Sequence, residues 1–321
     1  MPRASPTPSA RHWTFAPRTL EIVQNALAAP VDEALDLLAG RPLVALTGAG
    51  LSTDSGIPDY RGPGSPLRRP MTYGEFVSGP AAQRRYWARS HVGWARMRRA
   101  VPNPGHLALA DLERRGVLQG LITQNVDGLH GEAGNRALID LHGRIADVVC
   151  LSCGEISSRA VLQERFEQAN PGFADSVGPE IETAPDGDVL LERTEGFRLV
   201  GCATCGGALK PDVVFFGENV PKERVARAYA MVDALRPAGG ALLVAGSSLT
   251  VMSGLRFVRH AAKHDVPVVI VNRGETRGDP LAALHVDAGC SEVLSALAGA
   301  CGGSRVDGLD TPIPEWRDLA P

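Results

Sequence analysis

The chain has 321 residues, a formal net charge of −3, 21% charged residues and 44% hydrophobic residues. This balance is typical of a globular protein with a large core, and it gives no electrostatic case for nucleic-acid binding. The longest apolar runs are too short to span a bilayer, and residues 1–18 lack the apolar stretch of a secretory signal. We therefore expect a cytoplasmic protein without a membrane or nucleic-acid partner, and we favour a monomer.

The first buried strand expected along the chain ends in a glycine-rich turn. Residues 1–30 are rich in Pro, Ala and Arg and predict a flexible segment, and residues 31–39 predict a helix. The apolar run 42–46 then leads into Thr47-Gly48-Ala49-Gly50, where two glycines allow a tight turn and close approach to a phosphate at a helix N-terminus. Thr53 stands where the G-x-G-x-x-G pattern requires its third glycine, so this turn by itself also fits an ordinary connection.

Polar residues follow the next two expected strands. Residues 62–80 predict a loop, 81–100 and 105–115 predict helices, and 117–123 predicts a strand that runs into Gln124-Asn125-Val126-Asp127. A short strand over 137–141 runs into His142. Residues that directly follow parallel strands lie at the carboxyl edge of the sheet, where α/β folds bind ligands. His142 is a candidate general base there, although a single histidine is more often a surface or core residue.

Two C-x-x-C pairs form the strongest physical signal in the chain. Cys150 and Cys153 make one pair, and Cys202 and Cys205 make the other. Four thiolates can complete a tetrahedral Zn²⁺ site and leave no open position, so the metal would be structural. Two redox-active pairs are the alternative.

The remaining elements alternate between strand and helix. We expect strands at 213–216, 241–245 and 266–271, helices at 222–235, 255–263 and 291–298, and a tail over 301–321. The alternation predicts an α/β fold, a Rossmann-like doubly wound parallel sheet with a small inserted zinc-binding module and a helical insertion. The predicted division assigns 31–149 and 208–300 to the Rossmann-like domain, with the insertion at 62–104, and 150–207 to the zinc module.

Taken together, the motifs resemble the sirtuin family of NAD-dependent protein deacylases. They occur in family order over about residues 35–295, and they comprise Gly48-Ala49-Gly50-x-Ser52, Gly56-Ile57-Pro58-Asp59-Tyr60-Arg61, Thr123-Gln124-Asn125-Val126-Asp127, His142-Gly143, both C-x-x-C pairs, Lys210-Pro211-Asp212-Val213-Val214-Phe215-Phe216-Gly217-Glu218, Gly246-Ser247-Ser248-Leu249 and Val271-Asn272-Arg273. Residues 85–89 and 184–188 look most like the class II, mitochondrial-type branch.

The resemblance implies an NAD site, in which NAD is consumed as a cosubstrate. The implied cofactor-binding residues are Thr47, Gly48, Ala49, Gly50, Thr53, Ile57, Pro58, Asp59, Tyr60, Arg61, Gln124, Asn125, Val126, Asp127, Gly246, Ser247, Ser248, Asn272, Arg273, Gly274 and Cys290. The implied catalytic residues are His142, Asn125 and Asp127. His142 would act as general base on a ribose hydroxyl.

The resemblance also implies acyl-lysine proteins or peptides as substrates. The products would be free lysine, nicotinamide and O-acyl-ADP-ribose, and a protein mono-ADP-ribosyltransferase is the alternative activity. The implied substrate-binding residues are Tyr86, Arg89, Val214, Phe215, Phe216, Gly217 and Glu218. Tyr86 and Arg89, three residues apart on one helix face, resemble a pair that binds acidic acyl groups, but they also fit a packing tyrosine and a surface arginine.

Overall fold

The structure is a computed structural model that describes residues 29–60, 69–175, 184–189, 191 and 193–303. Residues 29–38 are helical, and Cys301–Gly303 forms a short 3-10 helix, η3. The rest of the expected N-terminal segment and C-terminal tail lies outside the described residues, as does Arg61. None of the helices among the described residues is long and apolar enough to cross a membrane.

The larger of the two sheets is parallel throughout. Its strands are β1 (Leu43–Thr47), β2 (Leu118–Thr123), β3 (Leu138–Asp140), β7 (Ala241–Ala245), β8 (Val268–Val271) and β9 (Leu284–Val286). They lie in the order β3-β2-β1-β7-β8-β9, and each neighbouring pair is parallel. Strand order reverses between β1 and β7, which is the switch point where Rossmann-like sheets bind dinucleotides. The predicted fold class is confirmed.

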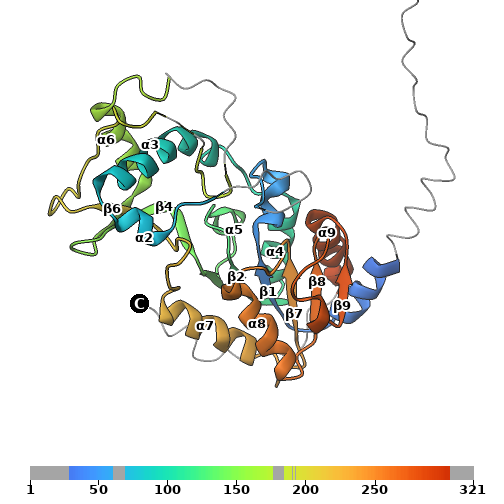
Figure 1. The fold of residues 1–321 in the computed structure, drawn as a ribbon. Helices are drawn as coiled ribbons and strands as arrows, with labels where there is room; N and C mark the ends of the chain where they lie inside the picture. Colours follow the sequence, from blue (N-terminus) through green and yellow to red (C-terminus); the bar gives the residue numbers. More distant parts are fainter. Residues whose placement is uncertain (1–28, 61–68, 176–183, 190, 192, 304–321) are drawn as a thin grey trace, which may run out of the picture.

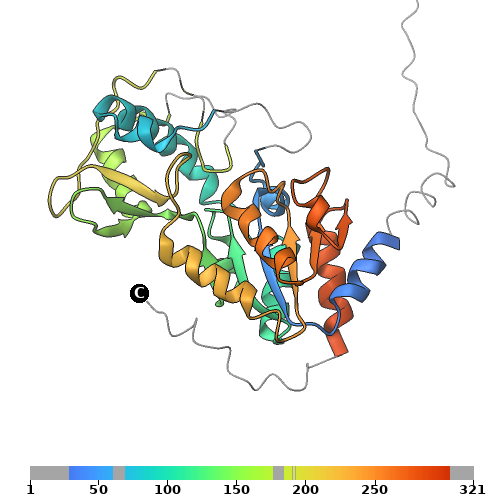
Figure 2. The ribbon, with the colours of Figure 1, turned by 60° about the horizontal axis from the view of Figure 1, so that its bottom comes forward.

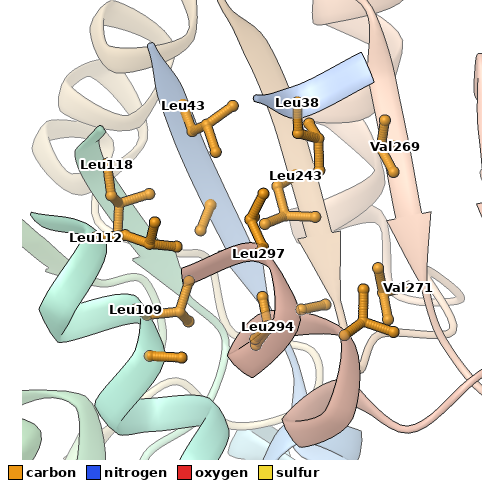
Figure 3. Close-up of a cluster of buried hydrophobic side chains, with 14 of the residues drawn as sticks. Leu38, Leu43, Leu109, Leu112, Leu118, Leu243, Val269, Val271, Leu294 and Leu297 are labelled. Carbon is orange, nitrogen blue, oxygen red and sulfur yellow. The ribbon is translucent and has the colours of Figure 1, made fainter. Parts of the chain in front are cut away.

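Helices cover both faces of this sheet and create two cores (Figure 1). The helix over residues 29–38, α4 (Pro104–Arg114) and α9 (Cys290–Ala300) cover one face, where Leu109, Leu243 and Leu294 meet (Figure 3). α7 (Lys222–Asp233) and α8 (Met252–Lys263) cover the other face. Every residue of β1 and β7 is buried, which is why both segments are nearly continuous apolar runs in the sequence.

A second lobe contains the smaller, antiparallel sheet, in the order β5-β4-β6 (Figures 1 and 2). Its strands are β4 (Gly143–Cys150), β5 (Ile156–Ser158) and β6 (Leu209–Val213), and its helices are α2 (Tyr73–Val77), α3 (Pro80–Met97) and α6 (Arg159–Ala169). An aromatic core that includes Tyr86, Trp87 and Phe215 joins them. All of β6 and all of β4 except Cys150 fall outside residues 150–207, and the predicted domain division stays a proposal.

Several local predictions are wrong. The region expected to be a loop contains α2, which Thr72 and Glu75 start with a reciprocal capping box. The strand expected at 213–216 is β6, which ends at Val213, and beyond it Phe216 makes only an isolated bridge to Thr72. β4, β5 and β9 were not expected; β5 and β9 have three residues each, too few to show a periodicity. Short helical turns complete the fold at η1 (Ala49–Ser55), α5 (Leu129–Ala133) and η2 (Asp279–Leu281).

Candidate active site

The glycine turn after β1 packs directly against the turn after β7. Gly50 N donates to Gly246 O at 2.8 Å, and Gly48 N donates to Ala245 O at 3.1 Å. A Cβ on Gly48 would lie 2.7 Å from Gly246 O, and one on Gly246 would lie 2.2 Å from Leu51 N, while Gly246 also has a φ of 67°. The two backbones can therefore meet only through glycine, and they form one continuous floor at the switch point. Thr53, in place of the third glycine, uses its hydroxyl to bond Gly50 O at 2.9 Å.

A polar network connects this floor to the end of β2. Asn125 Nδ2 donates to Gly48 O and to Ser52 Oγ, both at 3.1 Å. Ser52 Oγ donates to Asp127 Oδ2 at 2.7 Å, and Asp127 Oδ1 accepts from Leu129 N. The carboxylate of Asp127 is therefore fixed by two donors. Thr47 bonds Thr123 and His130, each at 2.9 Å, beneath the network.

His142 is held at both ring nitrogens. Nδ1 lies 2.9 Å from Gln124 O, and Nε2 lies 2.8 Å from Ser253 Oγ. Because a carbonyl oxygen can only accept, Nδ1 carries the hydrogen and Nε2 presents the lone pair. Burial lowers the pKa of His142 to about 4, and Arg224 and Arg256 act in the same direction. His142 is thus a neutral imidazole with its basic atom fixed, as a general base requires.

The other expected cofactor residues lie along the same sheet edge. Gln124 Nε2 donates to Ser247 Oγ at 2.9 Å, which ties the turn after β2 to the turn after β7. Asn272 directs its amide to Arg273 O and Gly274 O, closing the turn after β8. Cys290 is buried at the start of α9, and its thiol points to Val271 O. Burial raises the pKa of the Cys290 thiol to about 12, so it is a neutral group there.

The remaining expected cofactor residues follow the glycine turn or end β7. Ile57 is buried in the aromatic core, and the Tyr60 ring meets Phe216 edge-on at 6.1 Å. Pro58 and Asp59 lie between them, Ala49 begins η1, and Ser248 bonds Thr250. Val126 O accepts from Ile145 N at 2.8 Å, which anchors β4 beside the sheet edge.

The expected peptide-binding segment begins next to His142. Val214 N donates to His142 O at 2.8 Å. Phe215 is buried against Phe76, whereas Phe216 is 40% exposed. Glu218 does not point outward: its Oε2 accepts from Phe215 N at 2.8 Å and pairs with the buried Lys210 at 3.1 Å. The Glu218 carboxylate therefore closes the turn through Gly217, which has a φ of 79°.

Tyr86 and Arg89 lie on α3, and both are held by neighbouring groups. Tyr86 is buried among Phe76, Trp87 and Phe215. Arg89 Nε pairs with Asp188 Oδ1 at 3.1 Å and also donates to Val189 O. A small pocket is lined by Arg69, Pro70, Arg89, Ala184, Asp186, Asp188 and Val189. Asp186 accepts from the Tyr60 hydroxyl, which links this pocket to the segment that follows the glycine turn.

The four cysteines of the two C-x-x-C pairs converge in the second lobe. All four Sγ atoms lie within 4.8 Å of one another, with Cys150–Cys205 at 3.5 Å and Cys153–Cys202 at 3.8 Å. Tetrahedral Zn²⁺ with Zn–S bonds of about 2.3 Å requires S–S distances of about 3.8 Å. The donor set therefore fits a closed structural zinc site, and the cysteines form no disulfides.

The sequence pattern gave no role to three side chains that contact the expected site residues. Ser253 follows no motif and was placed outside the expected helix at 255–263. Lys210 was part of a quoted motif without a role, and Asp188 was quoted only as a class II feature. A buried lysine has no sequence signal apart from its partner, and Glu218 lies eight residues away across a turn.

The geometry defines a class: a Rossmann-like nucleotide-binding protein with a glycine floor at the switch point, a buried histidine at the carboxyl edge of the sheet and a four-cysteine zinc site in the second lobe. The model of the Sir2 family matches residues 48–253. An NAD-dependent protein deacetylase 1 of Mycobacterium avium is 57% identical over 269 residues, which cover 83% of this chain and 94% of that protein. The mitochondrial NAD-dependent protein lipoamidase sirtuin-4 of Bos taurus is 47% identical over 263 residues, which cover 79% of this chain and 81% of that protein.

Comparison with solved structures leads to the same family. A structure described as Sir2–p53 peptide–NAD⁺ matches with a TM-score of 0.64 and 30% identity, covering 85% of this chain and 98% of that one. The chain belongs to the sirtuin family. Its cosubstrate is NAD, and its cysteine cluster is a structural zinc site.

Proposed function

We propose that this protein is an NAD-dependent protein-lysine deacylase that transfers the acyl group of acyl-lysine to ADP-ribose and releases nicotinamide. At the coarser level it is a sirtuin-type NAD-dependent deacetylase. The observation that carries the proposal is His142, a neutral imidazole whose basic Nε2 is fixed at the carboxyl edge of the parallel sheet, next to the segment expected to hold the peptide.

Each part of the site has a separate task. The floor of Gly48, Gly50 and Gly246 brings backbone close to a diphosphate. Asn125 and Asp127, fixed by Ser52, would hold the nicotinamide end and its ribose. NAD supplies an electrophilic ribose carbon with nicotinamide as leaving group. His142 then takes a proton from a ribose hydroxyl at Nε2, and the Nδ1–H bond to Gln124 O keeps that atom in place.

Replacing the base separates the two halves of the reaction. We expect His142→Ala to reduce acyl transfer by at least roughly 100-fold, the usual worth of general-base catalysis. NAD binding should persist, because the glycine floor and Asn125 network do not include His142. The measurement is mass spectrometry of O-acyl-ADP-ribose together with calorimetric NAD binding. Wild-type turnover in this variant would refute the assignment.

We further propose that Arg89 sets a preference for acidic acyl groups such as succinyl or glutaryl. A guanidinium binds a carboxylate through paired hydrogen bonds, and Arg89 lies beside the buried Tyr86. In the structure Asp188 already pairs with Arg89. An incoming acyl carboxylate would compete with Asp188 for the charge of Arg89, so the Asp188 carboxylate would oppose the preference that Arg89 creates.

Removing that competition should sharpen the preference. Asp188→Asn keeps the shape of the side chain but removes its charge, and we expect the ratio of succinyl to acetyl kcat/KM to rise roughly 10-fold. Asp175→Asn, an exposed change in the same lobe, is the matched control. The readout is a mixed acyl-lysine peptide panel. An unchanged ratio in Asp188→Asn, or an unchanged ratio in Arg89→Met, would remove Arg89 from acyl selection.

A protein mono-ADP-ribosyltransferase stays the alternative function. It would leave an ADP-ribose label on protein without removing an acyl group, so the same incubation distinguishes the two by mass. The cytoplasmic location and the monomeric state stay proposals as well; one relative is bacterial and another is named as mitochondrial.

A further inference from the structure

A serine on a helix distant in the sequence forms a hydrogen bond with the basic nitrogen of His142. Ser253 Oγ lies 2.8 Å from Nε2, and the Ser253 residue is only 9% exposed. The two residues are far apart in the chain, on α8 and between β3 and β4. Since Nε2 carries the lone pair, the serine hydroxyl donates to it in this structure.

Ser253 does not serve as a helix cap. The N-cap of α8 is Val251, which has no side-chain capping bond, and Ser253 is the second residue of the helix. A hydroxyl near a helix start commonly accepts from a free backbone N–H. The Ser253 hydroxyl instead bonds the imidazole, so its position has a cause other than helix stability.

The neighbouring residue makes this placement rigid. A Cβ on Gly254 would lie 2.5 Å from Oε1 of Gln124. The start of α8 therefore packs tightly on Gln124, the residue whose carbonyl holds Nδ1. The two hydrogen-bond partners of His142, Gln124 and Ser253, thus belong to segments that pack closely on each other. Together they fix the imidazole ring at both of its nitrogens.

A hydroxyl can serve both protonation states of the ring. It donates to the lone pair of neutral Nε2, and after a rotation about Cβ–Oγ it can accept from Nε2–H. Neutral Nε2 has a single lone pair, so the ribose hydroxyl takes the place of the serine hydroxyl there when it gives up its proton, and the ribose oxygen keeps the electron pair for attack on the acyl carbon. A buried imidazolium without an acceptor at Nε2 would be costly, because a buried charged donor needs a partner.

We propose that Ser253 is a positioning residue for the general base, which orients the imidazole when it is neutral and accepts from Nε2–H once the ring has taken the ribose proton. This rests on the role of His142 in the proposed function. Ser253 acts through His142, so its loss should affect acyl transfer and spare the earlier cleavage of nicotinamide from NAD.

The test compares two steps in the full-length protein. We expect Ser253→Ala to lower kcat for deacylation roughly 10- to 100-fold, the worth of one hydrogen bond to a charged group. Exchange of labelled nicotinamide into NAD, and the KM for NAD, should stay within about threefold. Ser253→Thr keeps the hydroxyl and should restore deacylation, while Ser295→Ala, an exposed serine on α9, is the control for a serine-to-alanine change in a helix.

A double variant shows whether the effect passes through His142. In the His142→Ala background, Ser253→Ala should cause no further loss, since residues that act as a unit are not additive. Wild-type deacylation in Ser253→Ala, an equal loss of nicotinamide exchange, or an additive loss in the double variant would each overturn the proposal. If His142→Ala itself deacylates normally, the proposed function fails; if only Ser253→Ala does, this inference fails and the proposed function stands.

Discussion

At the scale of single residues, His142 shows how position fixes the tautomer and the charge of an ordinary side chain. A carbonyl at Nδ1 fixes the tautomer, and burial keeps the ring uncharged. The sequence marked His142 because it follows a strand. It could not show that Gln124 O selects the tautomer, because that contact depends on the turn after β2 folding back beneath the ring.

The depressed pKa of His142 predicts the acid limb of the pH profile. Because burial holds this pKa at about 4, the base is neutral at all pH values above about 5, and kcat for acyl transfer should not fall near pH 6.5. A kcat limb that titrates near pH 6.5 in wild type would contradict this assignment.

The same shift has a consequence for folding. The unfolded chain binds a proton at His142 near pH 6.5, and the folded chain does so only near pH 4. Stability is therefore present above about pH 6.5 and is lost as the pH falls from 6.5 towards 4. Urea unfolding of wild type and His142→Ala across this range measures the contribution as the difference in slope.

At the scale of elements, most of the expected site residues lie in the turns that follow the strands, and the strands determine where these turns are placed. The turn that follows β6 is closed by the Lys210–Glu218 pair, in which the lysine is buried and also bonds Val213 O at 2.6 Å. This turn places Phe215 against Tyr86 and Phe216 against Tyr60. The Glu218 expected to touch substrate thus holds the shape of the proposed peptide-binding segment through internal contacts.

Breaking this pair should disturb peptide binding. Glu218→Ala leaves a buried ammonium with fewer partners, and we expect a loss of roughly 3 kcal/mol in stability and a raised KM for peptide. The KM for NAD should change little. The double variant Lys210→Met, Glu218→Ala removes the unpaired charge and should recover part of the stability in urea unfolding. A single variant as stable as wild type would show that the pair does not hold the turn.

At the scale of the whole molecule, the two sheets position different parts of the protein. The parallel sheet supplies the switch point, and the lobe with the antiparallel sheet contains the cysteine cluster and the aromatic core to which Tyr86 belongs. Cys150 ends β4, the strand that begins directly after His142. The zinc site is thus connected through one strand to the edge where His142 lies, and its four cysteines leave no open position on the metal.

Removing the metal should unfold the second lobe. Structural zinc contributes folding free energy, so chelation or Cys205→Ser should lower the melting temperature by at least about 5 °C and abolish deacylation. Cys205 is exposed, so its loss reports on the metal and not on packing. Ala203→Ser, an exposed change to serine between the two cysteines of the same pair, is the control. Unchanged melting in Cys205→Ser with zinc absent by elemental analysis would refute a structural role.

The sequence by itself determined the parallel sheet, the cysteine cluster and the family. These follow from local patterns: apolar runs become buried strands, glycines allow close backbones, and paired cysteines bind zinc. The predictions from the sequence failed where a strand is short, as in β5 and β9. They also failed at α2, where the capping box of Thr72 starts a helix in a region expected to be a loop.

Only the tertiary structure decided which side chains meet. Ser253 at His142, Asp188 at Arg89 and Lys210 at Glu218 are contacts between different elements or across a turn. The hydrophobic periodicity of the sequence does not predict these contacts, because each contact depends on how whole helices, strands and turns pack. The tautomer of His142, the charge beside the proposed acyl site and the shape of the proposed peptide-binding turn are therefore properties of the fold. They are set by side chains that lie apart in the sequence.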